Sequence, residues 1–76
     1  MTMTAAEFRA RCDWAAVRAD VTEHRAQLEV AIQQTYAEVR AFCRPPRRRE
    51  QEDLAAWQQN IDACDWFLAA LDREGL

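Results

Sequence analysis

Hydrophobic side chains recur at alternating spacings of three and four residues in two segments between residues 28 and 71. This spacing predicts amphipathic α-helices with one apolar face each. A turn near residue 48 would place the two stripes opposite each other in layers, from Phe42 beside Leu54 to Leu28 beside Leu68. The pattern therefore predicts an antiparallel helical hairpin. The stripes are Leu28, Ile32, Thr35, Val39 and Phe42 in the first segment, and Leu54, Trp57, Ile61, Cys64, Leu68 and Leu71 in the second.

Two adjacent prolines mark the turn of this hairpin. The residue before Pro45 is disfavoured in the α region, so the first hairpin helix should end around residue 44. Pro46 suits the first position of the next helix. The acidic residues from Glu50 onward suit its first turns, where the helix dipole favours negative charge. The sequence thus predicts hairpin helices over residues 21–44 and 46–74.

The first 20 residues are left outside the hairpin and are expected to form an N-terminal helix or arm, residues 1–20. Thr4 and Glu7 match a capping box, in which each side chain bonds the other residue's backbone N–H. A helix should therefore begin there. Phe8 lies on one face of this helix, whereas Trp14 and Val17 lie on nearly the opposite face. A helix that is apolar on two sides is either sandwiched or broken part-way along.

A break within residues 13–20 is the favoured interpretation of these two faces. Asp20, followed three residues later by Glu23, is a second helix-start signal. Asp13 is a weaker candidate for the same role. Since no Gly or Pro enforces either break, one continuous helix from about residue 5 to residue 43 is the alternative.

Size and composition set the expected fold class. The chain has 76 residues, half of them hydrophobic, with one Gly and two Pro. Such a composition predicts an all-α fold in a single small domain, residues 1–76. A core of this size provides only a few kcal/mol of net stability. We therefore expect the apolar surface to be completed either within the chain, as a three-helix bundle, or by association into a dimeric helical assembly.

Charge and cysteine content argue against several classes of function. A net charge of −3 disfavours nucleic-acid binding, and no apolar run approaches the roughly 20 residues of a membrane span. The three Cys fit neither a disulfide framework nor a metal motif, so we expect reduced thiols and a cytoplasmic protein. There is a single His, and the acids are spread along helix faces expected to be exposed. We therefore expect no enzyme activity, catalytic site, metal ion or cofactor; a thiol- or metal-dependent enzyme is the weakest hypothesis.

The aromatic residues outside the hairpin layers are the candidates for binding a protein partner. Trp66 falls at a heptad position that faces away from the other hairpin helix, and Phe67 flanks it. An exposed Trp on a helix face rich in Ala usually covers or receives another helix. Either the first helix folds back onto this face, or a partner protein or a second copy covers it. The predicted binding residues here are Phe8, Trp14, Val17, Trp66 and Phe67.

Arginines surround the prolines at the hairpin turn. Arg47 and Arg48 are the candidates there for contact with an acidic partner surface or a phosphate. The acidic residues that follow them cancel much of this positive field. A solvated loop is therefore the more ordinary interpretation of the arginine run.

The hairpin resembles the small E-type (YscE-like) co-chaperones of bacterial type III secretion needles. The resemblance covers about residues 14–74, and rests on Gln27–Ile32, on Ala56-Trp57-Gln58, and on the spaced Cys64, Phe67, Leu68 and Leu71. Members of that family are short cytoplasmic hairpins that join a larger helical-repeat chaperone and hold the needle subunit unpolymerised before export. The resemblance implies a non-enzymatic adaptor or chaperone whose outer face contacts the partner chaperone. This chain departs from the family in its longer, Arg-rich turn and its aromatic N-terminal segment.

A protein encoded by a phage or mobile element is the alternative hypothesis. A short, acidic helical chain whose basic residues are all Arg, and which exposes a Trp, fits a protein that binds and modulates a host protein. Such a chain equally fits a component of virion assembly. Homodimerisation through the open end of the hairpin would give a four-helix assembly. Both hypotheses make the partner a protein.

Overall fold

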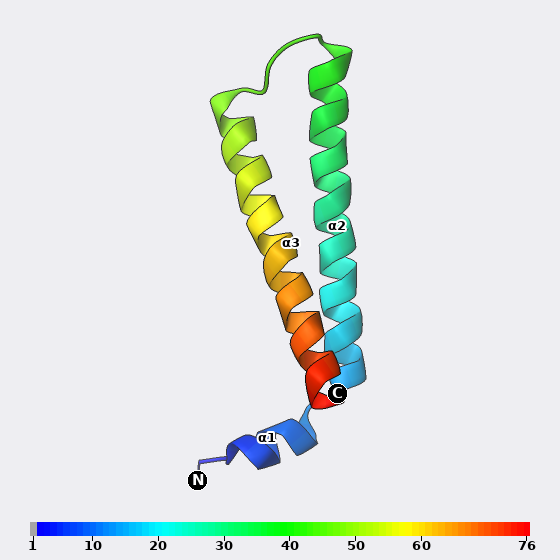
Figure 1. Cartoon of the computed structure of the whole chain (residues 1–76), viewed down its shortest axis with the longest axis vertical. Coiled ribbons are helices and arrows are strands. Elements are labelled where there is room, and N and C mark those ends of the chain that lie inside the picture. The colour runs from blue at the N-terminus through cyan, green and yellow to red at the C-terminus, as the bar shows by residue number, and fades with distance from the viewer. Residues whose placement is uncertain (1) are drawn as a thin grey trace.

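Three helices account for most of the computed structural model, which describes residues 2–76 (Figure 1). They are α1 (Ala5–Arg11), α2 (Trp14–Ala41) and α3 (Arg48–Glu74). The described residues contain no strand, and α2 and α3 run antiparallel as a long hairpin. The all-α fold and the helical hairpin predicted from the sequence are thereby confirmed.

Side-chain caps explain where the first two helices begin. The Thr4 Oγ1 accepts a hydrogen bond from the Glu7 backbone N–H at 3.2 Å, as the predicted cap requires. The Asp13 Oδ1 accepts one from the Ala16 N–H at 3.1 Å. The break between α1 and α2 therefore falls at the weaker of the two candidates. The favoured start at Asp20 is wrong, because this residue lies inside an unbroken α2 that Asp13 already caps.

Both hairpin helices differ from their predicted bounds at the turn. α2 ends at Ala41, and Cys43 adopts a left-handed backbone conformation with φ 49°. α3 begins at Arg48, two residues later than expected, where the Glu50 carboxylate accepts a hydrogen bond from the Arg47 N–H at 2.9 Å. At its far end α3 stops at Gly75, whose positive φ of 72° suits a residue without a side chain.

The layers of the hairpin are offset by one heptad from the predicted pairing. Cys64 was expected opposite Ile32, but it lies beside Val21 and His24 of α2. Ile32 instead shares a surface with Ile61. The loop explains the offset, because residues 42–47 centre the turn between residues 44 and 45 rather than near 48. When the centre of the turn moves by about three and a half residues, each residue of one helix faces a residue seven positions away in the other. A heptad stripe has the same apolar positions after a shift of seven residues, so both pairings fit the sequence pattern.

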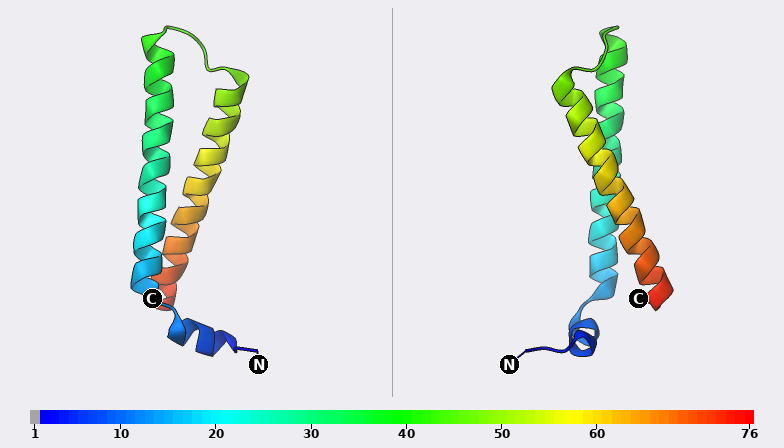
Figure 2. Two further views of the ribbon diagram at one scale, coloured as in Figure 1. Left: turned by 180° about the vertical axis from the view of Figure 1, so that it is seen from behind. Right: turned by 60° about the vertical axis from the view of Figure 1, so that its left-hand side comes forward.

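Phe42 is the clearest consequence of this offset. It was predicted as a core layer, but its side chain is 70% exposed. It follows the last residue of α2 in the turn, and α2 and α3 lean apart toward the loop in Figure 1 and in the left view of Figure 2. The buried hydrophobic residues of the described chain are Leu28, Ile61 and Leu71, and none of the three is completely shielded from solvent.

The molecule is long and thin, with extents of 56 × 21 × 19 Å. Its radius of gyration is 17.2 Å, whereas a compact chain of this length would have about 11 Å. α1 lies across the open end of the hairpin instead of along it (Figures 1 and 2). Among the described helices, only α2 and α3 pack against each other. The chain by itself therefore does not form the three-helix bundle that was one of the two expected arrangements.

Replacing a buried residue should distinguish the observed layers from the predicted ones. Ile61→Ala removes part of a side chain that is 5% exposed, and should destabilise the hairpin by about 2–5 kcal/mol. Phe42→Ala should change the free energy of unfolding by less than about 0.5 kcal/mol, as an exposed substitution does. Urea unfolding followed by far-UV circular dichroism measures both values. Equal losses for the two variants would contradict the observed layers.

Candidate partner-binding surfaces

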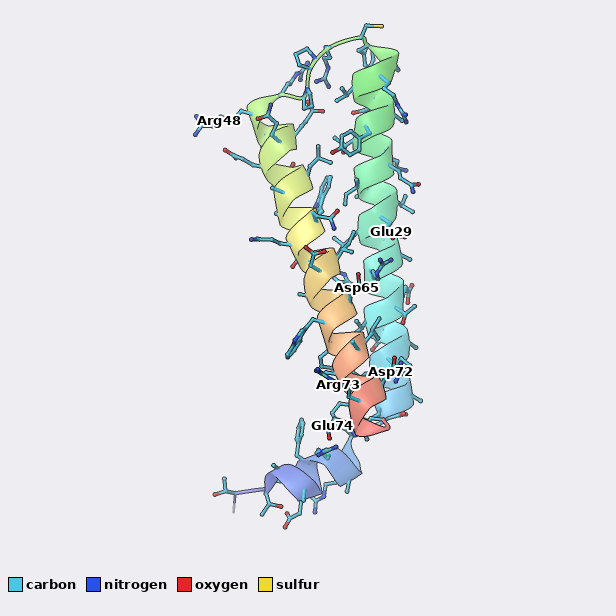
Figure 3. All side chains as sticks on the ribbon, viewed as in Figure 1. Glu29, Arg48, Asp65, Asp72, Arg73 and Glu74 are labelled. Carbon is cyan, nitrogen blue, oxygen red and sulfur yellow. The ribbon has the colours of Figure 1, made fainter. Side chains whose placement is uncertain are left out.

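The two long edges of the hairpin, where α2 and α3 meet solvent, differ in chemistry. On one edge Arg25 donates to the Asp65 carboxylate at 2.5 Å and to that of Glu29 at 2.6 Å. Figure 3 labels these two carboxylates on α3 and α2. Arg18 pairs with Asp72 at 2.8 Å on the same two helices. The hydrogen bonds that Arg25 donates to Asp65 and then to Glu29 raise the pKa of Arg25, so this edge carries a permanent cation between two carboxylates.

The opposite edge carries an apolar groove of about 250 Å³. No ion pair between described residues crosses it. We call this surface the apolar groove. It is lined by Val21 and His24 of α2 and by Asn60, Ala63, Cys64 and Phe67 of α3.

A wide apolar face on α3 produces the groove. Residues seven apart lie on the same side of a helix, so Phe67 continues the row of Asn60, next to the row that contains Cys64. α2 covers the side of α3 that holds Ile61, and leaves this flank half-buried. Cys64 was predicted as a core residue, and His24 and Ala63 were not predicted to line a groove. The sequence pattern that could have predicted the groove is the apolar face of α3, which is broader than one neighbouring helix can cover.

The predicted pair Trp66 and Phe67 is divided between two surfaces. Successive helix residues point about 100° apart, and only Phe67 lines the apolar groove. Trp66 lies outside the groove, and its side chain is 68% exposed. The structure therefore places Phe67 with Val21 and His24, and leaves Trp66 alone on the outer face of α3.

The three N-terminal candidates are also separated. Phe8 stands on α1 with its side chain 56% exposed. The Trp14 indole N–H donates to the Arg9 carbonyl at 2.6 Å, so this ring fastens the junction between α1 and α2. Val17 is half-buried on α2, one helical turn before Val21 of the apolar groove.

The arginines at the turn are largely neutralised by their own chain. Arg44 makes two hydrogen bonds to the Glu50 carboxylate, at 2.6 and 3.0 Å. Arg48 pairs with Glu52 at 3.2 Å, although its side chain is 93% exposed. Arg47 is exposed, and its hydrogen bonds within the described chain are made by its backbone: the N–H donates to Glu50 and the carbonyl accepts from the Gln51 N–H. Of the two predicted turn residues, Arg47 is thus the one whose guanidinium makes no ion pair within the described chain.

The titratable groups outside the turn do not assemble into a ligand set. His24 and Cys64 line the same groove, but within residues 2–76 no three His, Cys, Asp or Glu side chains converge as metal ligands would. Cys12, Cys43 and Cys64 are all reduced. None of the described helices is long and apolar enough to cross a membrane.

The Arg44–Glu50 pair should make part of the stability of the turn depend on pH. Hydrogen bonds from the Arg44 guanidinium and then the Arg47 N–H lower the pKa of Glu50 from its ordinary 4.5 to about 2. A carboxyl whose pKa is lower in the folded state stabilises the fold above its unfolded pKa, and this contribution is lost as the pH falls from about 4.5 to 2.

Glu50→Gln should therefore lose less thermal stability between pH 5 and pH 2 than the wild type, and be less stable at pH 7. Glu52→Gln is the control, because its partner Arg48 is almost fully exposed and such pairs contribute little. Melting curves by circular dichroism across this pH range measure the effect. Parallel pH profiles for Glu50→Gln and the wild type would contradict it.

No protein-family model, curated protein or solved structure matches this chain.

Proposed function

We propose that this chain is a non-catalytic, cytoplasmic protein-binding adaptor or chaperone that receives an amphipathic helix of a partner protein in its apolar groove. The observation that carries the proposal is the contrast between the two edges of the hairpin. Arg18 and Arg25 line one edge with ion pairs, whereas Phe67 and Cys64 leave the other edge apolar. A helix laid in such a groove buries the same kind of surface that helix-in-groove complexes use.

The small core supports this proposal. A layer of two helices can bury only one face of each, and a third element is the usual way to cover the remainder. Here only Leu28, Ile61 and Leu71 are buried among the described residues. A partner helix along the groove would cover Val21 and Phe67 and add a second contact to each hairpin helix.

Charge indicates what kind of helix fits. Asp20 lies one turn before His24 on the α2 side of the groove, and Asp53 continues the row of Asn60 and Phe67 on α3 toward the turn. Acidic residues therefore stand beyond both ends of the groove. A partner helix with an apolar stripe flanked by Arg or Lys would complement them.

The resemblance to the needle co-chaperones gives the proposal a specific form. In that form, the partner is a larger helical-repeat chaperone, and the two together hold a secretion needle subunit. Stable binding to both proteins on co-expression supports this form, and failure to co-purify with either removes it. A single host or virion protein recovered in equimolar amount would instead favour the phage or mobile-element form.

Blocking the groove should abolish partner binding without unfolding the hairpin. Ala63→Glu places a charged side chain in the groove from an exposed position, so the bound partner should fall at least about tenfold, as an interface anchor requires. Ala55→Glu is the matched control, since Ala55 is exposed on the same helix and lies outside the groove. Affinity capture of the partner with each variant, after circular dichroism has confirmed the helical content, measures the difference.

Trp66→Ala separates the groove from the outer face of α3. The groove proposal expects this variant to retain most of the partner, because Trp66 lies outside the groove. Loss of the partner with Trp66→Ala and retention with Ala63→Glu would move the binding surface to the outer face and overturn the proposal.

A further inference from the structure

α1 is an arm whose apolar side covers nothing on its own chain. Its seven residues cross the open end of the hairpin (Figures 1 and 2), and Phe8 is 56% exposed. Two polar contacts hold this arm. Arg9 pairs with Glu74 at 2.8 Å, and the Arg9 carbonyl accepts the Trp14 indole N–H at 2.6 Å. Neither contact places Phe8 against the hairpin.

The apolar groove and α1 correspond in length. A seven-residue helix is about 10 Å long, and the α3 wall of the groove, from Asn60 to Phe67, measures about 12 Å at the same rise per residue. The groove thus has room for one short helix beside α3. Each chain carries one such helix and one such groove.

We propose that α1 of one copy docks in the apolar groove of a second copy, with Phe8 as its anchor beside Phe67 and Val21. Repeated in both directions, this exchange makes a symmetric dimer. The inference rests on the proposed function, since it requires the groove to be a helix-binding surface. A partner helix then competes with α1 for the same groove.

Charge favours this occupant. Arg11 lies three residues after Phe8, so both are on one side of α1. Asp20 stands at the rim of the groove, one turn before His24. Neither Arg11 nor Asp20 makes an ion pair within the described chain. With Phe8 in the groove of a second copy, the two can pair between chains.

The chain also exposes enough surface to form a dimer of this kind. The chain exposes 6050 Å², whereas a compact monomer of its mass exposes about 4,800 Å². The excess is larger than the roughly 800 Å² that each partner contributes to a stable interface. In the dimer, each chain buries part of this excess surface twice, once on its own α1 and once in its own groove.

The observed position of α1 argues against its own groove as the destination. To fold back along α2, the arm would have to break both the Arg9–Glu74 pair and the Trp14–Arg9 hydrogen bond. A groove on a second copy can be filled with both contacts intact. The exchange therefore keeps every bond that positions α1 in the single chain.

Native cysteines provide the test. Cys12 lies one turn after Phe8 on the same side of α1, and Cys64 lines the groove. Cys43 is exposed in the turn, so it is first removed as Cys43→Ser. Treatment of this protein with a short bismaleimide should give a covalent dimer, and mass spectrometry of its digest should show a Cys12–Cys64 link. The same link within a covalent monomer would show that α1 folds back, and would overturn the proposal.

Dimerisation is measured independently by light scattering after gel filtration. The wild type should elute at twice the monomer mass, and Phe8→Asp should raise the dimer dissociation constant at least about tenfold. Ala6→Asp is the matched control, since it adds the same charge to the opposite side of α1 and should leave the dimer intact. The proposal is overturned if the wild type is monomeric at a protein concentration of about 100 µM, which is well above the dissociation constant of a typical stable dimer. It is also overturned if both variants weaken the dimer equally.

The outcomes separate this inference from the proposed function. Phe8→Asp leaves the groove unchanged, so it should still capture the partner that Ala63→Glu loses. If the wild type is monomeric while Ala63→Glu still loses the partner, the exchange is wrong and the protein-binding groove stands. If Ala63→Glu affects neither the dimer nor partner capture, both proposals fail.

Discussion

The contact between α2 and α3 is the constraint on which the rest of the structure depends. Two helices can bury only the stripe along which they touch, and here that stripe holds the three buried side chains of the described chain, Leu28, Ile61 and Leu71. No third layer covers the remaining faces. The elongated shape, the apolar groove and the exposed aromatic residues all follow from this one-layer contact.

Ion pairs decide which side of that contact is left apolar. Arg25 bridges Asp65 and Glu29, and Arg18 reaches Asp72. Because all of these groups lie on one edge, binding a helix there would require desolvating them, which is costly unless every charge is matched. Binding a helix at the edge with Phe67 does not require desolvating ion pairs. The asymmetry makes one face of a simple hairpin suited to a partner helix and the other suited to water.

Local signals predicted much of this fold, and particular residues show where they stopped. The Thr4 cap marked the true start of α1, because capping acts within a few residues. The prolines marked the turn, but α2 ends at Ala41 and α3 begins at Arg48, two to three residues from the predicted limits. Asp13 and Asp20 had similar local signals, and only the path of the chain selected Asp13. Phe67 was predicted as a binding residue, whereas its neighbours in the groove were not. Val21 and His24 come from the other helix, and the place of Cys64 in the groove depends on the exact layer pairing.

The sequence by itself determined the helices, their caps and the fact of a hairpin, because periodicity and capping are properties of neighbouring residues. Only the tertiary structure decided the layer pairing, the apolar edge and the position of α1. Heptad stripes match equally well after a shift of seven residues, so the six-residue loop 42–47 had to select one pairing. That choice exposed Phe42, placed Cys64 beside Val21, and opened the groove on the side away from Arg25.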